Sequence, residues 1–202
     1  CHHTYLLLAT GSMDCTTILY DISKVPPTIH SHLKHHSQAV IYISFHPNFN
    51  LFVTGSFDTT TILYDISTSP PTMKSHLKNH VQEINSVVFH PKLFYFASCS
   101  VDTTAILYNI STVSPTIQHH FKDHIRSVDA VAFHPNLQLF VTSSLDRFII
   151  IYDITTLIPT IKYKMKHKQR STRIRAIAFH SCSFLFATVS SDASTSLYDF
   201  KT

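Results

Sequence analysis

A tandem repeat restricts the possible folds of this chain more than any other feature. A Tyr-Asp pair, with one Tyr-Asn variant, recurs at steps of 44, 44, 44 and 46 residues. Its tyrosines are Tyr20, Tyr64, Tyr108, Tyr152 and Tyr198. An aspartate recurs with the same steps, at Asp14, Asp58, Asp102, Asp146 and Asp192. A period of this length is typical of stacked units that share a core between neighbours.

Each unit is expected to form four short strands. In the unit 37–80, residues 40–45 alternate between apolar and polar positions and are rich in β-branched and aromatic side chains, which favours a strand. Residues 51–56 and the nearly continuous apolar run 60–66 predict two more strands. The Pro70-Pro71 corner interrupts the ladder, and the polar residues 72–78 complete the unit. Four strands per repeat predict a propeller blade. A β-solenoid is the alternative, although its units are usually shorter and do not need the polar fourth strand.

The unit resembles the WD repeat, which runs from a Gly-His pair through a turn aspartate to a closing Trp-Asp pair. Here Tyr-Asp replaces Trp-Asp, and the chain contains no tryptophan. The Gly-His position holds His35-His36, Asn79-His80 and Asp123-His124. Because Asn, Asp and His tolerate positive φ better than most residues, we expect them to replace the glycine there. The resemblance implies an all-β WD-repeat β-propeller.

About five blades are expected, and the terminal ones are incomplete. The predicted units are 1–36, 37–80, 81–124, 125–168 and 169–202. The first unit begins at its second strand and the last stops after its third, so three full blades lie between two three-stranded ones. WD-repeat rings usually close by sharing a strand between their ends, and neither end offers a spare strand. We therefore expect a fragment of a larger ring, with a self-closed five-bladed ring as the alternative.

The resemblance also implies a buried polar network in each blade, joining a histidine, a strand hydroxyl, the turn aspartate and the strand aromatic. The expected members are His36, Thr54 or Ser56, Asp58 and Tyr64; then His80, Ser98 or Ser100, Asp102 and Tyr108; then His124, Thr142 or Ser144, Asp146 and Tyr152. Burying a carboxylate is costly unless it accepts hydrogen bonds, and these side chains are suitable donors. In the fifth unit Lys168 occupies the histidine position, which weakens the pattern.

No catalytic or metal site is predicted. Of the twelve carboxylates, five are turn aspartates and four belong to the Tyr-Asp pairs, which leaves Glu83, Asp123 and Asp129. These three are a poor supply for a catalytic dyad, and no nucleophile or phosphate-loop motif is present. The repeated turn histidines, His46, His90, His134 and His180, are expected to point outward around a ring rather than converge on an ion. The chain is therefore predicted to be no enzyme and to need no cofactor.

A partner-binding surface is predicted where the repeats differ from one another. The residue before each turn aspartate is Met13, Phe57, Val101, Leu145 and Ser191. The resemblance places these residues near the top entrance of the central channel, where four apolar side chains would form an interaction surface. In the alternative interpretation, they fold back onto a neighbouring blade.

A basic stretch provides a second candidate surface. Its residues are Lys162, Lys164, Lys166, Lys168, Arg170, Arg173 and Arg175. The first five alternate, so a strand would place them on one face. The remaining nine basic residues against twelve acidic ones give −3, so this stretch makes the net charge +4. It is either a solvated outer strand protected from aggregation or a contact for an anionic partner.

These observations favour a non-catalytic scaffold that binds partner peptides or proteins, and we expect it to act within a multiprotein complex. Binding of nucleic-acid phosphate or an anionic lipid surface through residues 162–175 is the alternative, and no small-molecule substrate is expected. Four scattered cysteines without a CxxC pair favour an intracellular location, cytoplasmic or nuclear. No apolar run approaches the ~18 residues of a membrane-spanning helix.

Overall fold

The structure, a computed structural model, describes residues 6–167 and 173–201, and all regular elements in these ranges are β-strands. They form five antiparallel sheets, of which the middle three have four strands and the outer two have three. The chain is therefore an all-β propeller segment with incomplete terminal blades. No helix capable of crossing a membrane occurs in the described ranges.

Each sheet is a meander of consecutive strands. The first sheet contains β1 (Leu7–Gly11), β2 (Thr17–Asp21) and β3 (Thr28–Leu33). The second contains β4 (Val40–Phe45), β5 (Leu51–Ser56), β6 (Thr61–Asp65) and β7 (Thr72–Leu77). The third contains β8 (Ile84–Phe89), β9 (Tyr95–Ser100), β10 (Ala105–Asn109) and β11 (Thr116–Phe121). The fourth contains β12 (Val128–Phe133), β13 (Leu139–Ser144), β14 (Phe148–Asp153) and β15 (Thr160–Lys166). The fifth contains β16 (Ile174–Phe179), β17 (Leu185–Ser190) and β18 (Thr195–Asp199).

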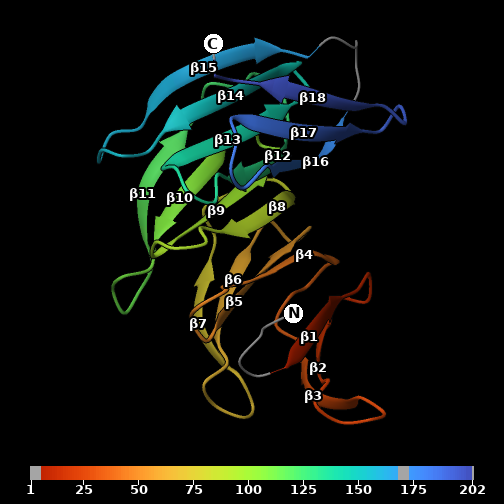
Figure 1. Cartoon of the computed structure of the whole chain (residues 1–202). Coiled ribbons are helices and arrows are strands. Elements are labelled where there is room, and N and C mark those ends of the chain that lie inside the picture. Colours follow the sequence, from red (N-terminus) through yellow and green to blue (C-terminus); the bar gives the residue numbers. More distant parts are fainter. Residues whose placement is uncertain (1–5, 168–172, 202) are drawn as a thin grey trace.

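The sheets are arranged around an axis as an open arc (Figure 1). The first strands of the second to fifth sheets contact one another in turn, β4 with β8, β8 with β12 and β12 with β16. These strands therefore line the inside of the arc, and β7, β11 and β15 form its outer edge. The first and last sheets lie at the two ends of the arc, so the described residues do not form a self-closed ring.

Aromatic stacks fill the space between strands two and three of the blades. Phe52 on β5 stacks on Tyr64 of β6 with ring centroids 4.6 Å apart, and Phe96 stacks on Tyr108 at 4.5 Å. These side chains are almost fully buried, and burying such a ring contributes about 1.5–3 kcal/mol to stability. In the three complete blades, the tyrosine of the repeat thus supplies a large buried ring.

The sheets approach one another closely at the only two glycines of the chain. A Cβ atom on Gly55 would lie 2.7 Å from Cγ2 of Ile84 in the next sheet. A Cβ atom on Gly11 would lie 2.5 Å from the carbonyl oxygen of Val40. Glycine is needed here for close approach, since neither residue has positive φ.

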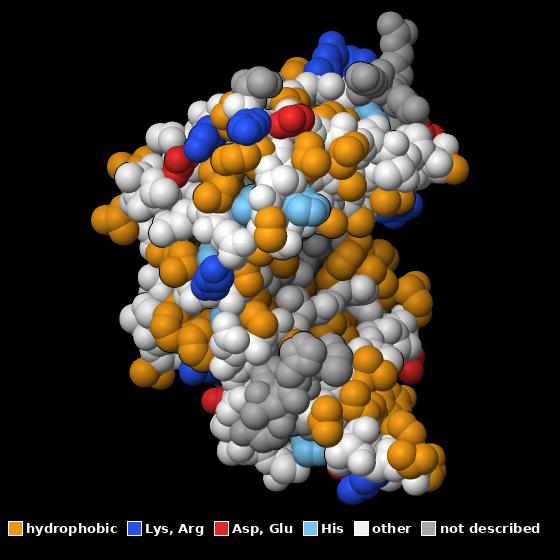
Figure 2. Space-filling view, viewed as in Figure 1, with side chains coloured by type: hydrophobic (Ala, Val, Ile, Leu, Met, Phe, Trp, Pro, Cys, Tyr) orange, Lys and Arg blue, Asp and Glu red, His pale blue; other side chains and the backbone are white. Residues whose placement is uncertain are grey.

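The outward faces of the terminal sheets lack the cover that inner sheets have. Leu8 is 42% exposed, whereas Phe52 at the same repeat position is 0% exposed. At the other end Leu197 is 68% exposed, whereas its equivalent Ile151 is 0% exposed. Hydrophobic side chains are visible over the first sheet at the lower right of Figure 2. Blade-to-blade packing therefore stops at both ends of the arc.

The prediction that the Phe-His turn histidines point outward was wrong for three of the four. His46, His90 and His134 are buried, and His180 alone is exposed. His90 Nδ1 accepts hydrogen bonds from the backbone N–H groups of Lys92 (3.1 Å) and Leu93 (2.9 Å). Its ring lies 5.0 Å from that of Phe133 in the next sheet. These bonds fold the imidazole inward over the turn, where it joins the interface between sheets.

The expectation of positive φ at the Gly-His position was also wrong, because His35, Asn79 and Asp123 have ordinary backbone angles. Positive φ occurs instead directly after each turn aspartate, at Cys15, Thr59, Thr103, Arg147 and Ala193. The tight turn between strands two and three demands the left-handed conformation, whatever residue stands there.

Candidate functional site

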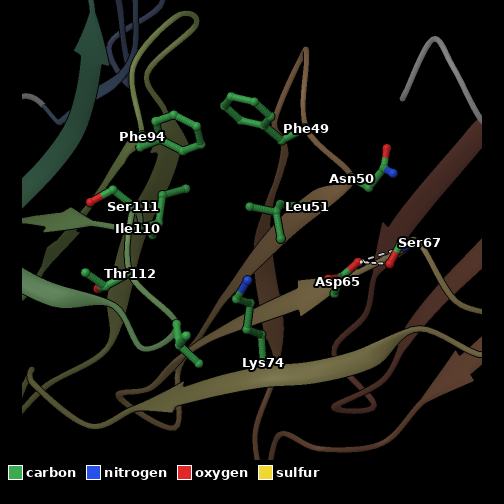
Figure 3. A pocket seen from close by; sticks show the side chains of 11 residues that line it. Phe49, Asn50, Leu51, Asp65, Ser67, Lys74, Phe94, Ile110, Ser111 and Thr112 are labelled. Atoms are coloured by element: carbon green, nitrogen blue, oxygen red, sulfur yellow. Dashed lines mark hydrogen bonds between the residues drawn. The ribbon is translucent and has the colours of Figure 1, made fainter.

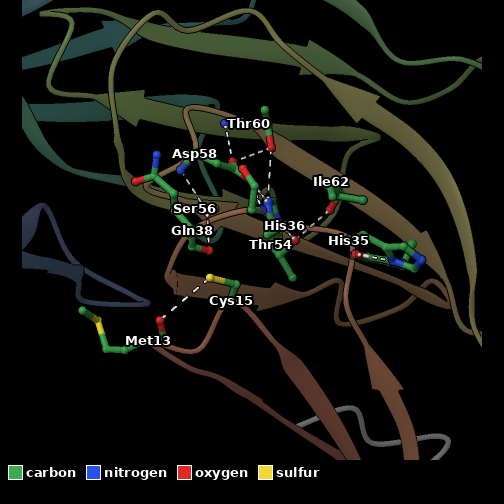
Figure 4. Close-up of polar contacts among 12 residues, drawn as sticks. Met13, Cys15, His35, His36, Gln38, Thr54, Ser56, Asp58, Thr60 and Ile62 are labelled. Atoms are coloured by element: carbon green, nitrogen blue, oxygen red, sulfur yellow. Dashed lines mark hydrogen bonds and ion pairs between the residues drawn. The ribbon is translucent and has the colours of Figure 1, made fainter.

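The turn aspartate of each complete blade is fixed by a histidine from the preceding loop, and Figure 4 shows this network in the second sheet. His36 Nδ1 donates to Asp58 Oδ2 at 2.8 Å, and the Ser37 N–H donates to the same oxygen at 2.9 Å. The other oxygen, Asp58 Oδ1, accepts the hydroxyl of Thr60 at 2.6 Å. The equivalent distances for His80–Asp102 and His124–Asp146 are also 2.8 Å. The carboxylate is thus satisfied on both oxygens although its side chain is nearly buried.

Each network histidine uses its second nitrogen on the first of the two candidate hydroxyls. His36 Nε2 accepts the hydroxyl of Thr54 at 2.8 Å. Ser98 and Thr142 have the same role, at 2.7 and 2.8 Å. Ser56 instead donates to the Gln38 carbonyl at 3.0 Å and accepts the Asp58 N–H at 3.0 Å. The two hydroxyl positions therefore fix the histidine and the turn backbone respectively.

Two of the three strand tyrosines bond to the residue before the network histidine and not to the turn aspartate, and the Thr54 and Thr142 hydroxyls act on the same two phenols. Tyr152 donates to Asp123 Oδ2 at 2.9 Å, and the Tyr64 hydroxyl lies 3.1 Å from His35 Nδ1. These partners directly precede the network histidines His124 and His36. Burial raises the pKa of Tyr64 and of Tyr152, so both remain neutral.

The network has a fixed charge state near neutral pH. Burial raises the pKa of Asp58, but hydrogen bonds from Thr60, the Ser37 N–H and His36 outweigh it and lower the pKa overall. Burial lowers the pKa of His36, and the hydrogen bond and charge of Asp58 offset only part of this effect. A charged aspartate thus holds a neutral histidine, an arrangement suited to fixing the turn.

The fifth blade has a reduced version of the network. Lys168, assigned to the histidine position from the sequence, lies outside the described residues. The preceding His167 is buried, and its Nε2 lies 3.2 Å from the hydroxyl of Ser190. Burial lowers the pKa of His167. Ser190 is the equivalent of Ser56, so this histidine contacts the turn-fixing hydroxyl instead of the inner one.

The predicted partner-binding residues lie on one face of the arc, at the turns between strands two and three. The backbone N–H groups of Phe57, Val101 and Leu145 donate to the carbonyls of residues 39, 83 and 127, at 3.0 Å in each case. The face bearing these turns and the loops before the first strands is called the turn face below. The three side chains are half-buried, and Met13 in the first sheet is exposed. Phe57, Val101 and Leu145 are therefore partly covered and partly in solvent.

Sequence reasoning missed two apolar residues of the turn face. Val81 and Ile125 are 81% and 84% exposed. Each directly follows a network histidine and donates its backbone N–H to the turn aspartate at 3.1 Å. The signal was available in the sequence, because an apolar residue following a fixed histidine is held in the loop with its side chain outside the network.

The structure divides the basic stretch between two places. Lys162, Lys164 and Lys166 are exposed on one face of β15, at the outer edge. Lys168 and Arg170 lie outside the described residues. Arg173 and Arg175 lie at the start of the fifth sheet and within β16, on the inside of the arc. The described members therefore do not form one anionic-partner surface.

Two of the outer lysines have partners within the chain. Lys162 Nζ lies 3.8 Å from Asp153 Oδ2, and Lys164 Nζ lies 4.7 Å from the ring centroid of Phe148. Both side chains remain largely exposed. Because exposed pairs of this kind are screened by solvent, each contributes only ~0–1 kcal/mol. The edge of β15 is thus a modest basic surface.

The opposite face, at the other end of the strands, contains a pocket of about 420 Å³ between the second and third sheets. Phe49 and Phe94 stack at its mouth with centroids 4.4 Å apart, and Ile110 and Leu51 line its wall (Figure 3). Asp65, which lies at the rim, accepts the Ser67 N–H at 2.8 Å and the Ser67 hydroxyl at 2.6 Å. The pocket is mainly apolar, with one lysine, Lys74, and one aspartate, Asp65, in its lining.

The described residues contain no group of three or more His, Cys, Asp or Glu side chains able to hold a metal ion. The buried turn histidines are separated because each belongs to a different blade.

Comparison with known protein families identifies the repeat. The family model for the WD domain, G-beta repeat, matches residues 27–65, 71–109 and 115–153. Each match runs from the outer strand of one sheet to the third strand of the next, so the sequence repeat is offset from the structural blade. No curated protein matches this sequence significantly.

Solved structures agree on the fold. A chain in the crystal structure of a mitotic checkpoint complex superposes with a TM-score of 0.84 at 16% sequence identity. The match covers 99% of this chain and 61% of that chain. Propellers matched by this family model generally mediate protein–protein interactions and are generally non-catalytic. The repeats, the turn networks and the blade arrangement together show that this chain belongs to the WD-repeat family of β-propellers.

Proposed function

We propose that this propeller segment is a non-catalytic scaffold that binds a partner protein on its turn face. The observation that carries the proposal is the row of apolar side chains on successive blades of this face. It consists of Phe57, Val101 and Leu145 at the turns and of Val81 and Ile125 in the adjoining loops. Exposed apolar groups aligned in this way usually mark an interaction site.

The rigidity of the turn face supports the proposal. The backbone of the residues that carry these apolar side chains is fixed by the histidine–aspartate networks and by backbone hydrogen bonds of 3.0 Å. A preformed surface loses little conformational freedom when a partner binds, which favours affinity.

The test compares capture of partners by wild type and by Val101→Asp and Leu145→Asp, each measured by quantitative mass spectrometry and repeated with the purified partner. We expect a fall in affinity of at least about tenfold, because each change places a charge in an apolar contact. Ile117→Asp on β11 is the matched control, since Ile117 is an exposed apolar residue on the outer edge of the same blade as Val101.

Equal loss with Ile117→Asp, or unchanged binding with both turn-face variants, would contradict the proposal. Nucleic acid or anionic lipid captured in low salt and released by Lys162→Glu and Lys164→Glu would favour the basic edge of β15 instead, because phosphate contacts weaken steeply with salt. Binding to the apolar turn face should persist at raised ionic strength.

A further inference from the structure

A polar cluster interrupts the repeat pattern on the inside of the arc. The second residue of the first strand is Ile41 in the second sheet, but Asn85, Asp129 and Arg175 in the next three. The Asp129 residue is only 4% exposed. Its Oδ1 atom accepts the hydroxyl of Ser127 at 2.8 Å and the Arg173 Nε–H at 3.0 Å. The cluster therefore joins three consecutive sheets.

The guanidinium of Arg173 is held in a fixed orientation. Besides its bond to Asp129, it donates from Nη2 to Asn85 Oδ1 at 3.4 Å. Asn85 is itself fixed, since its amide donates to the Ser127 hydroxyl and the Val128 carbonyl, both at 2.9 Å. A guanidinium has five N–H donors, and these contacts use two. The side chain is 32% exposed, so remaining donors face solvent inside the arc.

A second cation and a phenol lie in the same region. Arg175 is exposed and follows two residues later, on β16. Burial raises the pKa of Tyr42 on β4, while the charges of Arg175 and Arg173 act to lower it. Both arginines therefore exert their charge on one phenol. Against the single carboxylate of Asp129, the cluster carries one excess positive charge.

This cluster borders the turn face. The Arg173 carbonyl accepts the Ser191 N–H at 2.8 Å, in the same way that the Ser127 carbonyl accepts the Leu145 N–H at 3.0 Å. Arg173 and Ser127 thus lie directly inside the row of apolar turn residues. A peptide lying across Val101 and Leu145 would pass the cluster.

We infer that Arg173 and Arg175 bind the carboxylate of an acidic residue in a partner peptide whose apolar side chains contact the turn face. The inference rests on the proposed function and specifies the chemistry of the partner. A guanidinium already oriented by Asp129 and Asn85 can form charge-assisted hydrogen bonds to a carboxylate without further ordering. Two arginines beside a carboxylate are too few to follow a nucleic-acid backbone, which needs a row of cations along a groove.

The experiment selects peptides from a random linear library displayed on phage, with the whole chain as bait. The most enriched peptide is synthesised with its acidic residues and again with each replaced by the corresponding amide. Binding is measured by fluorescence anisotropy against wild type, Arg175→Gln and Arg173→Gln. Arg126→Gln is the matched control, because Arg126 is an exposed arginine on the turn face and its loss changes net charge equally.

We expect enrichment of an acidic residue next to apolar ones and about a tenfold loss of affinity with Arg175→Gln. The amide peptide should lose at least this factor on wild type and a smaller factor on Arg175→Gln, where Arg173 alone still binds the carboxylate. Arg173→Gln leaves Asp129 buried without its cation, so its fold is checked by circular dichroism. The exposed Arg175 keeps the test valid if that variant unfolds.

Peptides without acidic enrichment, unchanged binding with Arg175→Gln, or an equal loss with Arg126→Gln would each overturn the inference. Peptides that are sensitive to Val101→Asp but not to the arginine changes would overturn it while leaving the proposed function standing. If Val101→Asp and Leu145→Asp leave all selected peptides bound, the proposed function itself fails. Preference for a phosphoserine version over the acidic peptide would replace the carboxylate with phosphate and overturn the stated ligand.

Discussion

His80 Nδ1 lies 2.8 Å from Asp102 Oδ2, and this pair links the loop that enters the third blade to the turn at the blade's centre. The two residues are 22 positions apart, so the contact forms only when the blade has folded. Burial raises the pKa of Asp102, but hydrogen bonds from His80, Thr104 and the Val81 N–H hold it well below its usual range. The aspartate is therefore charged at neutral and mildly acidic pH.

Removal of either partner should destabilise the blade. His80→Ala and Asp102→Ala each leave a buried polar group without its partner, and we expect each to lower the free energy of unfolding by about 2–4 kcal/mol. In a double-mutant cycle followed by urea denaturation, the pair should show about 1–3 kcal/mol of coupling. In the control cycle, the effects of Asp102→Ala and of the exposed His180→Ala should be additive. If the effects of His80→Ala and Asp102→Ala were also additive, that result would contradict a direct interaction between His80 and Asp102.

Replacement of the residue after a turn aspartate by glycine should stabilise the chain. Thr59 has φ of 73°, a conformation that is strained for a β-branched residue and freely available to glycine. We expect Thr59→Gly to raise the free energy of unfolding by about 1 kcal/mol. Thr116→Gly, at the start of a strand with an ordinary backbone, should instead lower it. A loss of stability with Thr59→Gly would show that the turn is not strained.

Addition of one methyl group at Gly55 should disrupt the contact between the second and third sheets. The new Cβ would lie 2.7 Å from Ile84 Cγ2 and 2.9 Å from Val87 Cγ1, so one sheet must move. We expect Gly55→Ala to cost about 1–3 kcal/mol in thermal or urea denaturation. Combined with Val87→Ala, the total loss should be smaller than the sum of the two single changes. A fully additive result would indicate that the sheets do not meet at this glycine.

Stability should fall in mild acid because of a buried turn histidine. Burial, with smaller contributions from the charges of His46 and Lys92, lowers the pKa of His90 to about 4 from its ordinary value of 6.5. Between these pH values the unfolded chain binds a proton that the folded chain does not. The contribution of His90 is therefore fully present above pH 6.5 and is lost as the pH falls towards about 4. Urea denaturation at several pH values measures this slope.

The matched variants are His90→Asn and His180→Asn. Asparagine offers an acceptor for the turn N–H groups and does not titrate, so His90→Asn should reduce the pH dependence. His180 occupies the equivalent turn but is exposed, so its replacement should leave the slope nearly unchanged. The same slope in wild type and His90→Asn would assign the acid sensitivity to other groups.

The sequence by itself determined the architecture of this protein. The repeat of Tyr20, Tyr64, Tyr108, Tyr152 and Tyr198, with its proline-marked turns, required identical units, and the alternation within each unit required strands. The pairing of His36 with Asp58, and of its equivalents, also followed from their constant separation by way of the family resemblance. A repeated pattern is sufficient to predict these strands and pairs, because they form within one blade and every blade packs in the same way.

Only the tertiary structure decided what happens between blades. The sequence of one repeat predicted that His90 points outward. In the structure Phe133 of the next sheet packs against His90, which is buried. The sequence also grouped Arg173 into one basic stretch with Lys162. The structure places Lys162 on the outer strand β15 and Arg173 beside the inner strand β16, where Arg173 bonds to Asp129, 44 residues away. These contacts depend on which strand of the neighbouring sheet comes close, and that is set by the stacking of blades around the axis.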